Sequence, residues 1–466
     1  MGIFKPCDIR GVYNRELTDE DARNLGLAVG SYIHAGTVLV AGDIRLSTPA
    51  LQAALCAGLV AAGCRVIDAG LLTTPAFYFA AQHIDAAAGV MVTASHNPPE
   101  YNGFKILFAG RPVRPEELTV LKHMIAGRKF VPGRGAYLRD ETWLTRYRDY
   151  LAGCFKPGQL PVVLDCGNGA CSLIAPELFR ALGYRVSELY CTPDGRFPNR
   201  PPNPALPENL RALCRRVVRE GAAAGIAFDG DGDRVALVDE TGSVIASDRL
   251  LAILARYMLK QEKGVIVYDS KCSLVVPETV SRCGGTPLMA RSGHTFVQNR
   301  FLSAHALLAG ELSGHFFWRE LGFDDGLFSA LKVLELLDGN KTGLAALNRA
   351  IPRYLITPDI RLPFTGDPGK ILAAVRRKLS PFPVSTIDGV RVEFPDCWGM
   401  IRPSVTEPLL TFRGEGKTKE RLTFIINLFL AALPAEISDQ MQKKLAAGTN
   451  AESPPAFAGA PDFQRD

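Results

Sequence analysis

The sequence lacks the features that mark several large classes of protein. Its net charge is only +5 over 466 residues, and it has no cluster of Lys and Arg with interleaved aromatic side chains. The longest apolar stretches, 250–259 and 424–433, are shorter than the roughly 20 residues that a membrane-spanning helix needs. We therefore expect neither a nucleic-acid-binding protein nor a membrane protein.

The cysteines lack the spacing of a metal site. There are 11 of them, an odd number, with no CxxC pair, and Cys166 and Cys171 have no second pair to complete a zinc site. The first residues, MGIFKPCDIRG, contain no apolar signal-peptide region, and Pro6 breaks the myristoylation pattern. We expect a reduced, cytoplasmic protein.

The residues that are present describe a soluble globular chain of several domains. Apolar residues make up 47% and charged residues 22%, and a chain of this length divides into roughly three or four domains. Strands expected at 37–41, 65–68 and 87–93 alternate with helices expected at 48–62 and 75–82. This alternation predicts a mainly parallel sheet with helices on both faces.

Three alanine-rich segments suggest an internal repeat of architecture. They read AAAGVMVTASH (86–96), AAAGIAFDGDGDR (222–234) and AHALLAGELSGH (304–315), and each runs from an apolar strand into a polar loop. Loops at the carboxyl ends of such strands can converge on one cleft.

The first of these loops presents a hydroxyl beside an imidazole. Ser95 and His96 follow the apolar run 86–92 and precede two prolines, which cannot continue a strand. A nucleophile on an α/β sheet occupies this position. Taken alone, the stretch is more simply described as a strand that ends in an Asx turn.

The second loop carries three carboxylates, Asp229, Asp231 and Asp233, separated by glycines. Carboxylates held this close repel one another unless a cation lies between them. Hard oxygen ligands in small number suit Mg²⁺ bound beside a phosphate. The alternative is a solvated acidic turn.

The third loop combines Glu311, Ser313 and His315, a mixed set of donors and acceptors that suits sugar hydroxyls. The alternative is a strand-to-helix turn with a hydrogen-bonded histidine.

Further along the chain, the segment 402–408 (RPSVTEP) has the composition of an anion-binding loop, with Arg402, Ser404 and Thr406 as donors. The alternative is a surface turn with a capping serine. Arg10 and Lys105 are further cationic candidates, although either alone is more often a solvated surface charge.

In this order, between Asp8 and about Leu433, the motifs resemble those of the α-D-phosphohexomutases, and most of all the phosphomannomutase/phosphoglucomutase branch. The resemblance implies three similar mixed-sheet α/β domains and a C-terminal α+β domain, TATA-binding-protein-like, around a central cleft. The expected divisions are 1–140 with the phosphoserine loop, 141–244 with the metal loop, 245–352 with the sugar loop, 353–435 with the phosphate loop, and 436–466 as a polar, disordered tail.

The same resemblance implies a role for each candidate residue. Ser95 is expected to be the phosphoserine, and with Asp229, Asp231 and Asp233 to hold one Mg²⁺. Glu311 and Ser313 are expected to bind the sugar, and Arg402, Ser404 and Thr406 the substrate phosphate. The acid/base candidates are Lys105 with His315 or His96, and Arg10 and Arg234 are expected beside the phosphoserine.

The implied activity is that of an isomerase that interconverts hexose 1-phosphate and hexose 6-phosphate, with mannose and glucose phosphates as substrates and a hexose 1,6-bisphosphate as intermediate. The expected partners are small-molecule hexose phosphates, and the chain is expected to be a monomer or small homo-oligomer. Alternatives are a phosphoglucosamine mutase, a metal-dependent phosphatase and a non-catalytic sugar-phosphate-binding protein. By the same resemblance, Leu312 and Phe104 favour the mannose/glucose branch over the phosphoglucosamine branch.

Three positions depart from the family pattern. Gln298 stands where a lysine is usual, Val405 where Asn or Gly is usual, and Cys7 where a tyrosine is frequent. None of them removes the nucleophile, the carboxylates or the sugar loop. We expect an active enzyme whose efficiency these departures alter.

Overall fold

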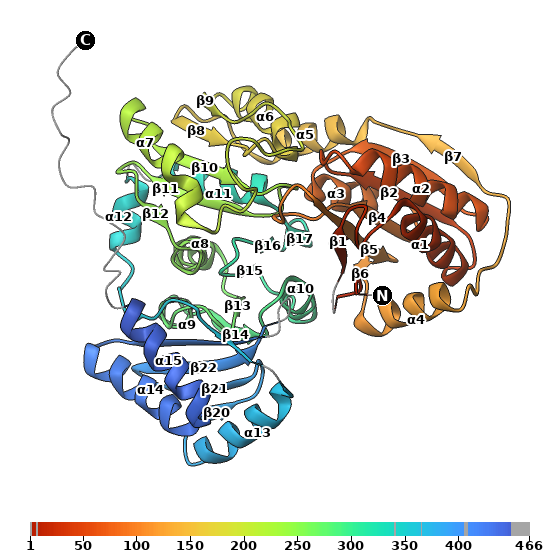
Figure 1. Ribbon diagram of the computed structural model, residues 1–466. Coiled ribbons are helices and arrows are strands. Elements are labelled where there is room, and N and C mark those ends of the chain that lie inside the picture. Colours follow the sequence, from red (N-terminus) through yellow and green to blue (C-terminus); the bar gives the residue numbers. More distant parts are fainter. Residues whose placement is uncertain (1, 6–7, 340–341, 365, 405–408, 449–466) are drawn as a thin grey trace, which may run out of the picture.

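The computed structural model describes residues 2–5, 8–339, 342–364, 366–404 and 409–448. These residues form four β-sheets with helices packed on them, and the sheets follow one another along the chain (Figure 1). The first three sheets mix parallel and antiparallel strands, whereas the fourth is antiparallel throughout. The expected fold class is confirmed, and the residue limits of the domains remain a prediction.

The first sheet has the strand order β1-β5-β4-β2-β3-β7, with β6 paired to β5. Its strands are β1 (Ile9–Val12), β2 (Thr37–Gly42), β3 (Arg65–Leu71), β4 (Ala88–Val92), β5 (Tyr101–Phe108), β6 (Arg111–Pro112) and β7 (Ala136–Arg139). Its helices are α1 (Asp19–Tyr32), α2 (Thr48–Ala61), α3 (Thr74–His83) and α4 (Pro115–Ala126). Strand β4 is buried along its whole length, as expected for a strand covered by helices on both faces.

The second and third sheets repeat one pattern: three parallel strands followed by two antiparallel ones, in the orders β9-β8-β10-β11-β12 and β14-β13-β15-β16-β17. The second sheet contains β8 (Pro161–Asp165), β9 (Arg185–Leu189), β10 (Ala224–Phe228), β11 (Val235–Asp239) and β12 (Val244–Ile245). The third contains β13 (Val265–Asp269), β14 (Thr286–Ala290), β15 (Leu308–Gly310), β16 (Phe316–Trp318) and β17 (Phe323–Asp324). The helices of this part of the chain are α5 (Trp143–Cys154), η1 (Ala170–Leu173), α6 (Ala175–Ala181), η2 (Pro207–Leu210), α7 (Arg211–Glu220), α8 (Ser247–Gln261), α9 (Val275–Arg282), α10 (His294–Ser303), α11 (Gly326–Gly339) and α12 (Leu344–Arg349).

The three polar loops occupy equivalent places in the first three sheets. Each joins a strand of the parallel part to its antiparallel neighbour: β4 to β5, β10 to β11, and β15 to β16. The predicted repeat is therefore present as a repeat of topology, and it gives each sheet one loop at the same edge.

The fourth sheet has the order β18-β23-β22-β21-β20, with β19 paired to β23. Its strands are β18 (Leu355–Ile356), β19 (Ile360–Pro363), β20 (Val384–Ser385), β21 (Val390–Phe394), β22 (Cys397–Pro403) and β23 (Leu409–Gly416), and its helices are α13 (Pro368–Leu379), α14 (Lys419–Ala432) and α15 (Ala435–Gly448).

Helix α15 corrects the expectation of a disordered tail from residue 436. Ile437 and Met441, four positions apart on one face, are buried in the core of the fourth sheet. The polar composition of the segment concealed this apolar stripe. Residues 449–466 lie outside the described part of the chain.

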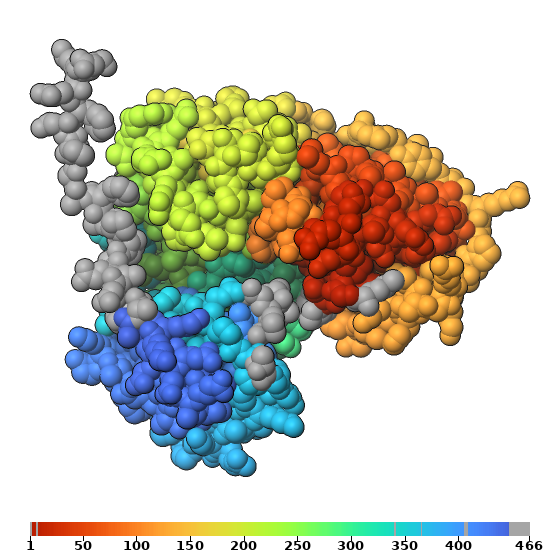
Figure 2. Space-filling view, viewed as in Figure 1, coloured from red at the N-terminus to blue at the C-terminus, as the bar shows by residue number. Residues whose placement is uncertain are grey.

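One continuous core runs through the first three sheets, from Leu39 to Ile351, while the fourth sheet has a separate core. The space-filling view shows a hollow between the first sheet's part of the chain, in red and orange, and the fourth sheet's part, in blue (Figure 2). Among the described helices, none combines the length and apolar character of a membrane span.

Candidate active site

Ser95 lies just beyond the end of β4 in a strained backbone conformation. Its φ of +50° falls in the left-handed region, which a non-glycine residue rarely adopts. Its backbone N–H donates to Thr93 Oγ1 (2.9 Å), and its own hydroxyl donates to Asp229 Oδ2 (2.8 Å). His96 Nδ1 lies 3.3 Å from the same hydroxyl. The structure therefore places the predicted nucleophile against the predicted metal loop.

Arg45 holds the serine loop, and the sequence analysis did not identify it. Its guanidinium is fully buried, pairs with Asp43 (3.1 Å) and donates to four backbone carbonyls. The carbonyls are those of Ser95 (2.8 Å), Asn97 (2.6 Å), Pro98 (2.6 Å) and Tyr101 (3.0 Å). An Asp-x-Arg triplet directly after a buried strand was the available signal, since a buried arginine needs several acceptors.

The acidic loop follows β10 and gathers Asp229, Asp231 and Asp233. One carboxylate oxygen from each lies within 4.8 Å of the others, and all three side chains are buried. Asp231 Oδ1 and Asp233 Oδ1 have no hydrogen-bond partner among the described residues. Burial, together with the charges of Asp231 and Asp233, raises the pKa of Asp229 well above its usual value. Buried, unpartnered carboxylate oxygens at this separation fit a divalent cation such as Mg²⁺.

Gly230 allows the acidic loop to approach the serine loop. A Cβ atom at this position would lie 2.4 Å from the carbonyl oxygen of Ser95, too close for any other residue. Gly230 thus serves the contact between two loops that come from different sheets.

Lys105 on β5 places a positive charge against the carboxylates, and Arg234 Nε lies 3.9 Å from Asp229 Oδ2. The ammonium group of Lys105 donates to Asp231 Oδ2 (2.8 Å) and to Asp233 Oδ2. Burial acts to lower the pKa of Lys105, but the charges of Asp231 and Asp233 outweigh it and raise that pKa well above its usual value. Lys105 is therefore a cation in the structure.

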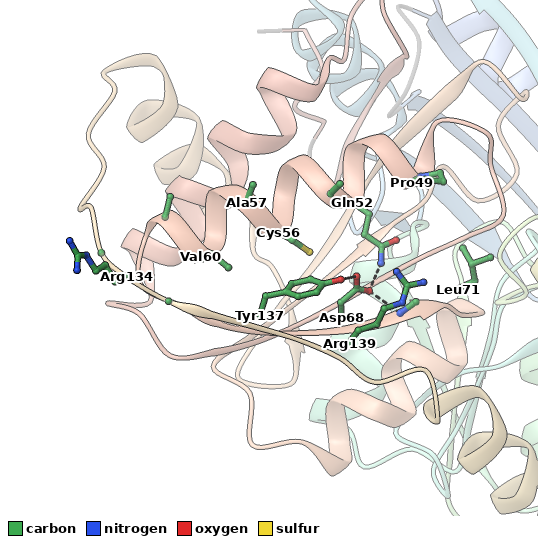
Figure 3. A pocket seen from close by; sticks show the side chains of 15 residues that line it. Pro49, Gln52, Cys56, Ala57, Val60, Asp68, Leu71, Arg134, Tyr137 and Arg139 are labelled. Atoms are coloured by element: carbon green, nitrogen blue, oxygen red, sulfur yellow. Dashed lines mark hydrogen bonds between the residues drawn. The ribbon is translucent and has the colours of Figure 1, made fainter.

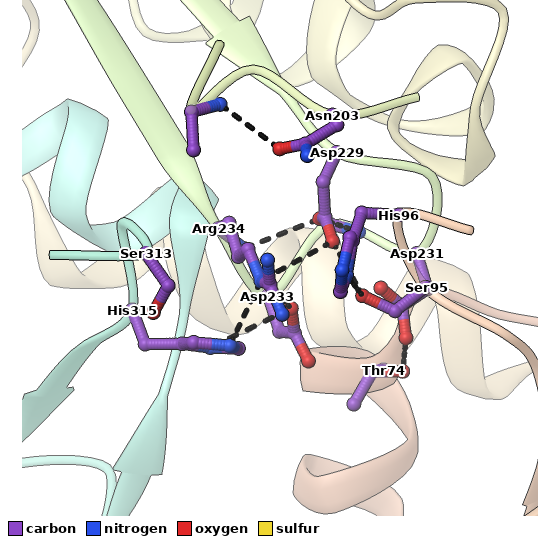
Figure 4. A network of polar contacts seen from close by, with 12 residues as sticks. Thr74, Ser95, His96, Asn203, Asp229, Asp231, Asp233, Arg234, Ser313 and His315 are labelled. Carbon is purple, nitrogen blue, oxygen red and sulfur yellow. Dashed lines mark hydrogen bonds and ion pairs between the residues drawn. The ribbon is translucent and has the colours of Figure 1, made fainter. Parts of the chain in front are cut away.

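Two histidines, His294 and His315, adjoin the carboxylates, and Figure 4 shows His315 beside Arg234 and Asp233. His315 Nδ1 lies 2.5 Å from Asp324 Oδ2, and Arg234 Nε donates to His315 Nε2 over 2.9 Å. Because Nε2 accepts, these contacts assign the proton of a neutral His315 to Nδ1. His294 Nε2 also contacts Asp324, at 2.9 Å. The sequence predicted no role for Asp324 or His294. One potential metal-ligating atom from each of four residues lies within 4.8 Å of the others, and these residues are Asp233, His294, His315 and Asp324.

The third loop holds Glu311 and Ser313 beside His315. Ser313 Oγ donates to Glu311 Oε2 (3.3 Å), and the backbone N–H of Glu311 donates to the carbonyl of His315 (3.0 Å). Glu311 Oε1 is buried and lacks a hydrogen-bond partner among the described residues, and burial raises the pKa of this carboxyl. Glu311 Oε1 is thus left to accept a hydrogen bond from a ligand.

The guanidinium of Arg402, on β22, has only part of its hydrogen-bonding capacity filled by the described residues. Its Nε donates to Asp388 (3.0 Å), while its buried Nη2 has no hydrogen-bond partner among the described residues. Asp388 also accepts from Ser270 Oγ (2.9 Å), which links the fourth sheet to the third. The Ser404 N–H donates to the Leu409 carbonyl (2.8 Å). Thr406, Val405 and Cys7 lie outside the described residues.

Two further cations complete the surroundings of Ser95. Arg10 donates to Asn97 Oδ1 (2.6 Å), next to the serine loop. Arg10 and Arg234 line a cavity of about 70 Å³ together with Ser95, Lys105 and His315.

The pKa of His96 is held well below its usual value, first by burial and then by the charges of Arg234 and Arg10. Gln298, which stands where a lysine is usual in the family, is a buried residue of α10.

A larger cavity, of about 840 Å³, lies away from these residues, between α2 and β7 (Figure 3). Its polar groups are mostly paired with one another, since Asp68 accepts from Gln52 Nε2 (2.6 Å) and from Tyr137 OH (2.6 Å). Asp68 is the one carboxylate among the described residues that line it.

These contacts define the class of the protein. A buried serine hydroxyl against three carboxylates that fit a divalent cation, with Lys105 and two arginines around it, is the equipment of a phosphoryl-transfer enzyme. The three loops that supply it come from three sheets of the same topology.

Comparisons with known proteins identify the family. The chain matches the alpha/beta/alpha domains I, II and III of phosphoglucomutase/phosphomannomutase over residues 1–131, 145–242 and 246–354. It is 42% identical to the phosphomannomutase/phosphoglucomutase of Pseudomonas aeruginosa over 446 residues (93% of this chain, 96% of that protein). It is 35% identical to the phosphoglucomutase of Neisseria gonorrhoeae over 444 residues (92% and 96%). A crystal structure of a phosphoglucomutase/phosphomannomutase family protein from Burkholderia thailandensis superimposes with a TM-score of 0.87 at 37% identity (93% and 97%).

The chain belongs to the phosphoglucomutase/phosphomannomutase family of the α-D-phosphohexomutases, which are isomerases that act by phosphoryl transfer. The predicted family and class of activity are confirmed. The individual roles of the site residues remain predictions.

Proposed function

We propose that this protein interconverts the 1-phosphates and 6-phosphates of mannose and glucose through a phosphoserine at Ser95 and a hexose 1,6-bisphosphate. The observation that carries the proposal is the 2.8 Å contact of Ser95 Oγ with Asp229 in a cluster of three buried carboxylates. The names of the relatives, which include both sugars, support the choice of substrates.

In the first half of the cycle, the free hydroxyl of a hexose phosphate attacks the phosphorus of phosphorylated Ser95. The new phosphorus–oxygen bond forms as the bond to Ser95 Oγ breaks, and the sugar leaves the serine as a 1,6-bisphosphate. The bisphosphate then turns end for end, and its other phosphate returns to Ser95 by the reverse of the same step. No phosphate is gained or lost over the whole cycle.

Asp229, Asp231 and Asp233, with the Ser95 phosphate, would hold one Mg²⁺, and this ion would supply positive charge to the transferring group. Lys105, Arg10 and Arg234 add fixed positive charge around Ser95. Such preorganised charge stabilises a transferring phosphoryl group without reorganisation of solvent.

Proton transfer falls to groups close to Ser95 Oγ. His96 Nδ1 is 3.3 Å from that oxygen and can exchange a proton with it directly. Lys105 and His315 line the same small cavity: His315 is the candidate to accept the proton of the sugar hydroxyl, whereas Lys105, already a cation, is a candidate only to donate a proton. The contact of His315 Nδ1 with Asp324 orients its ring for this role.

The remaining residues fix the orientation of the substrate. Glu311 Oε1 and Ser313 Oγ would bind sugar hydroxyls, and Arg402, Ser404 and Thr406 would bind the phosphate that does not react; the buried Glu311 Oε1 and Arg402 Nη2, each without a partner among the described residues, support these roles. Because one phosphate-binding loop serves both orientations, the same nucleophile reaches both ends of the bisphosphate.

The test is turnover of the purified protein with Mg²⁺ and glucose 1,6-bisphosphate as activator. Mannose 1-phosphate and glucose 1-phosphate are expected to isomerise, glucosamine 1-phosphate to react more slowly, and Ser95→Ala to lose isomerisation while Ser281→Ala, an exposed serine, keeps it. Release of inorganic phosphate in place of isomerisation would identify a phosphatase. Faster turnover of glucosamine 1-phosphate would identify a phosphoglucosamine mutase, and binding without turnover a non-catalytic protein.

Three broader features belong to the same proposal: free hexose phosphates as the ligands, the cytoplasm as the compartment, and a monomer or small homo-oligomer as the assembly. Light scattering of the purified chain checks the assembly.

A further inference from the structure

Two cysteines face each other at the end of the second sheet. Strands β8 and β9 are parallel neighbours whose last paired residues are Asp165 and Leu189. Just beyond this pair, the sulfurs of Cys166 and Cys191 lie 3.3 Å apart. A disulfide needs a separation of about 2.05 Å, so a shift of roughly 1.3 Å would bring the two sulfurs to bonding distance.

The two thiols differ in the way that a redox-active pair requires. Cys191 is partly exposed and can meet a reagent from solvent, whereas Cys166 is fully buried. Contact with the Cys166 thiol lowers the pKa of Cys191, and burial raises the pKa of Cys166. The more exposed Cys191 is therefore the thiol that an external reagent reaches first, and the buried Cys166 lies close enough to form a disulfide with it.

The loop after Cys166 supports the acidic loop directly. The N–H of Ala170 donates to the carbonyl of Gly230 over 2.9 Å. A Cβ atom on Gly169 would lie 2.9 Å from the carbonyl oxygens of Asp229 and Gly230, which shows how closely the two loops pack.

The loop after Cys191 is tied to the same place. The N–H of Asp194 donates to the carbonyl of Asn168 (3.0 Å), and Asn168 Nδ2 donates to the carbonyl of Thr192 (2.8 Å). Arg200, further along, donates to the carbonyl of Phe228 (2.8 Å), the residue before Asp229. A movement of either cysteine loop is thus transmitted to the carboxylates through a few hydrogen bonds.

We propose that Cys166 and Cys191 are a redox-modification site whose oxidation to a disulfide displaces the acidic loop and weakens its hold on a divalent cation. The effect on cation binding is independent of the proposed function; the accompanying fall in turnover rests on it. The oxidant is a small-molecule disulfide of the glutathione class.

The oxidation balances as a two-step exchange. The Cys191 thiolate attacks one sulfur of the oxidant, its disulfide bond breaks, and one thiol leaves. The Cys166 thiol then loses its proton and attacks the Cys191 sulfur, which releases the second thiol and forms the Cys166–Cys191 bond. Two protein thiols are oxidised and one external disulfide is reduced to two thiols.

The experiment uses the full chain, incubated with oxidised glutathione and then freed of it. Peptide mapping is expected to find a Cys166–Cys191 cross-link, and calorimetry with Mg²⁺ alone is expected to show about a tenfold loss of affinity, the size typical when support behind metal ligands is lost. Dithiothreitol should then remove the cross-link and restore the affinity for Mg²⁺. Cys191→Ser should bind Mg²⁺ normally and resist the treatment, whereas Cys154→Ser, an exposed cysteine of α5, should respond as the parent chain does.

A cross-link between other cysteines, or a Cys166–Cys191 cross-link that leaves Mg²⁺ affinity unchanged, overturns the proposal. Because Cys191 is partly exposed, its serine variant keeps the test valid even if a Cys166 variant does not fold. A protein that fails to isomerise hexose phosphates but loses Mg²⁺ affinity on oxidation would reject the proposed function and leave this inference standing.

Discussion

The hydroxyl of Ser95 donates a 2.8 Å hydrogen bond to Asp229 Oδ2, although 134 residues separate them in the chain. The bond joins loops from two different sheets, and Gly230 lets their backbones approach. The nucleophile and the metal loop therefore form one unit, in which a change on either loop affects the other.

The charge of the acidic loop should determine the affinity for Mg²⁺. Asp231→Asn keeps the size of the side chain and an acceptor for Thr74 Oγ1, which donates to Asp231 Oδ2 over 2.7 Å. We expect Mg²⁺ affinity, measured by isothermal titration calorimetry, to fall by at least about tenfold. Asp149→Asn, an exposed residue of α5, is the control, and equal affinities in the two variants would show that this loop is not the metal site.

Lys105 should stabilise the metal-free protein. Its ammonium group neutralises buried carboxylates, so Lys105→Met is expected to cost about 3–5 kcal/mol of unfolding free energy in metal-free buffer. Bound Mg²⁺ replaces part of the missing charge. The rise in Tm on adding Mg²⁺ should therefore be larger in Lys105→Met than in the parent chain. The exposed Lys260→Met should show the parent's rise, and an equal rise in Lys105→Met would contradict the prediction.

Arg402 should act on substrate binding more than on the chemical step. Arg402→Lys removes the forked donor group whose Nη2 is left without a partner among the described residues. We expect KM for glucose 1-phosphate to rise by about 10- to 100-fold, the worth of one charged hydrogen bond, with a smaller change in kcat. Steady-state kinetics with Arg377→Lys, an exposed residue of α13, as control measure the difference. A fall confined to kcat would place Arg402 at the reacting phosphate.

Asp325 should give the fold a specific pH dependence. Burial raises its pKa to about 7, and it contacts Tyr147 OH and the Phe328 N–H. Because an unfolded Asp titrates near about 4, the stability from the neutral carboxyl is complete below about pH 4 and is lost as pH rises toward about 7. Asp325→Asn removes this titration, so the variant should gain stability relative to the parent chain over this interval, by up to about 4 kcal/mol. Urea unfolding at about pH 5 and about pH 8 measures it; a pH-independent difference would reject the assigned pKa.

The motifs were predictable from the sequence because each is a local pattern. A strand that ends in Ser95, or glycines that alternate with Asp229, Asp231 and Asp233, can be recognised without knowledge of the fold. The repeat of topology was predictable for the same reason, since each segment shows an apolar strand that ends in a polar loop.

The supporting residues were not predictable, because their roles arise from tertiary contacts. Arg45 lies 50 residues before Ser95: the Asp-x-Arg triplet indicates a buried arginine, but nothing in the spacing indicates that it binds the carbonyls of that loop. The carboxylate of Asp324 contacts His294 and His315, which lie on separate elements of the chain. In α15, an apolar stripe of few residues was hidden by polar composition.

The central claim, that Ser95 carries the transferred phosphoryl group, is tested most directly by mass spectrometry after incubation with glucose 1,6-bisphosphate. The parent chain should gain the mass of one phosphoryl group on the peptide that contains Ser95. Ser95→Ala should remain unmodified and should lose isomerisation of both mannose 1-phosphate and glucose 1-phosphate. A phosphoryl group on another residue, or a Ser95→Ala variant that isomerises both sugars at the parent rate, would contradict the account.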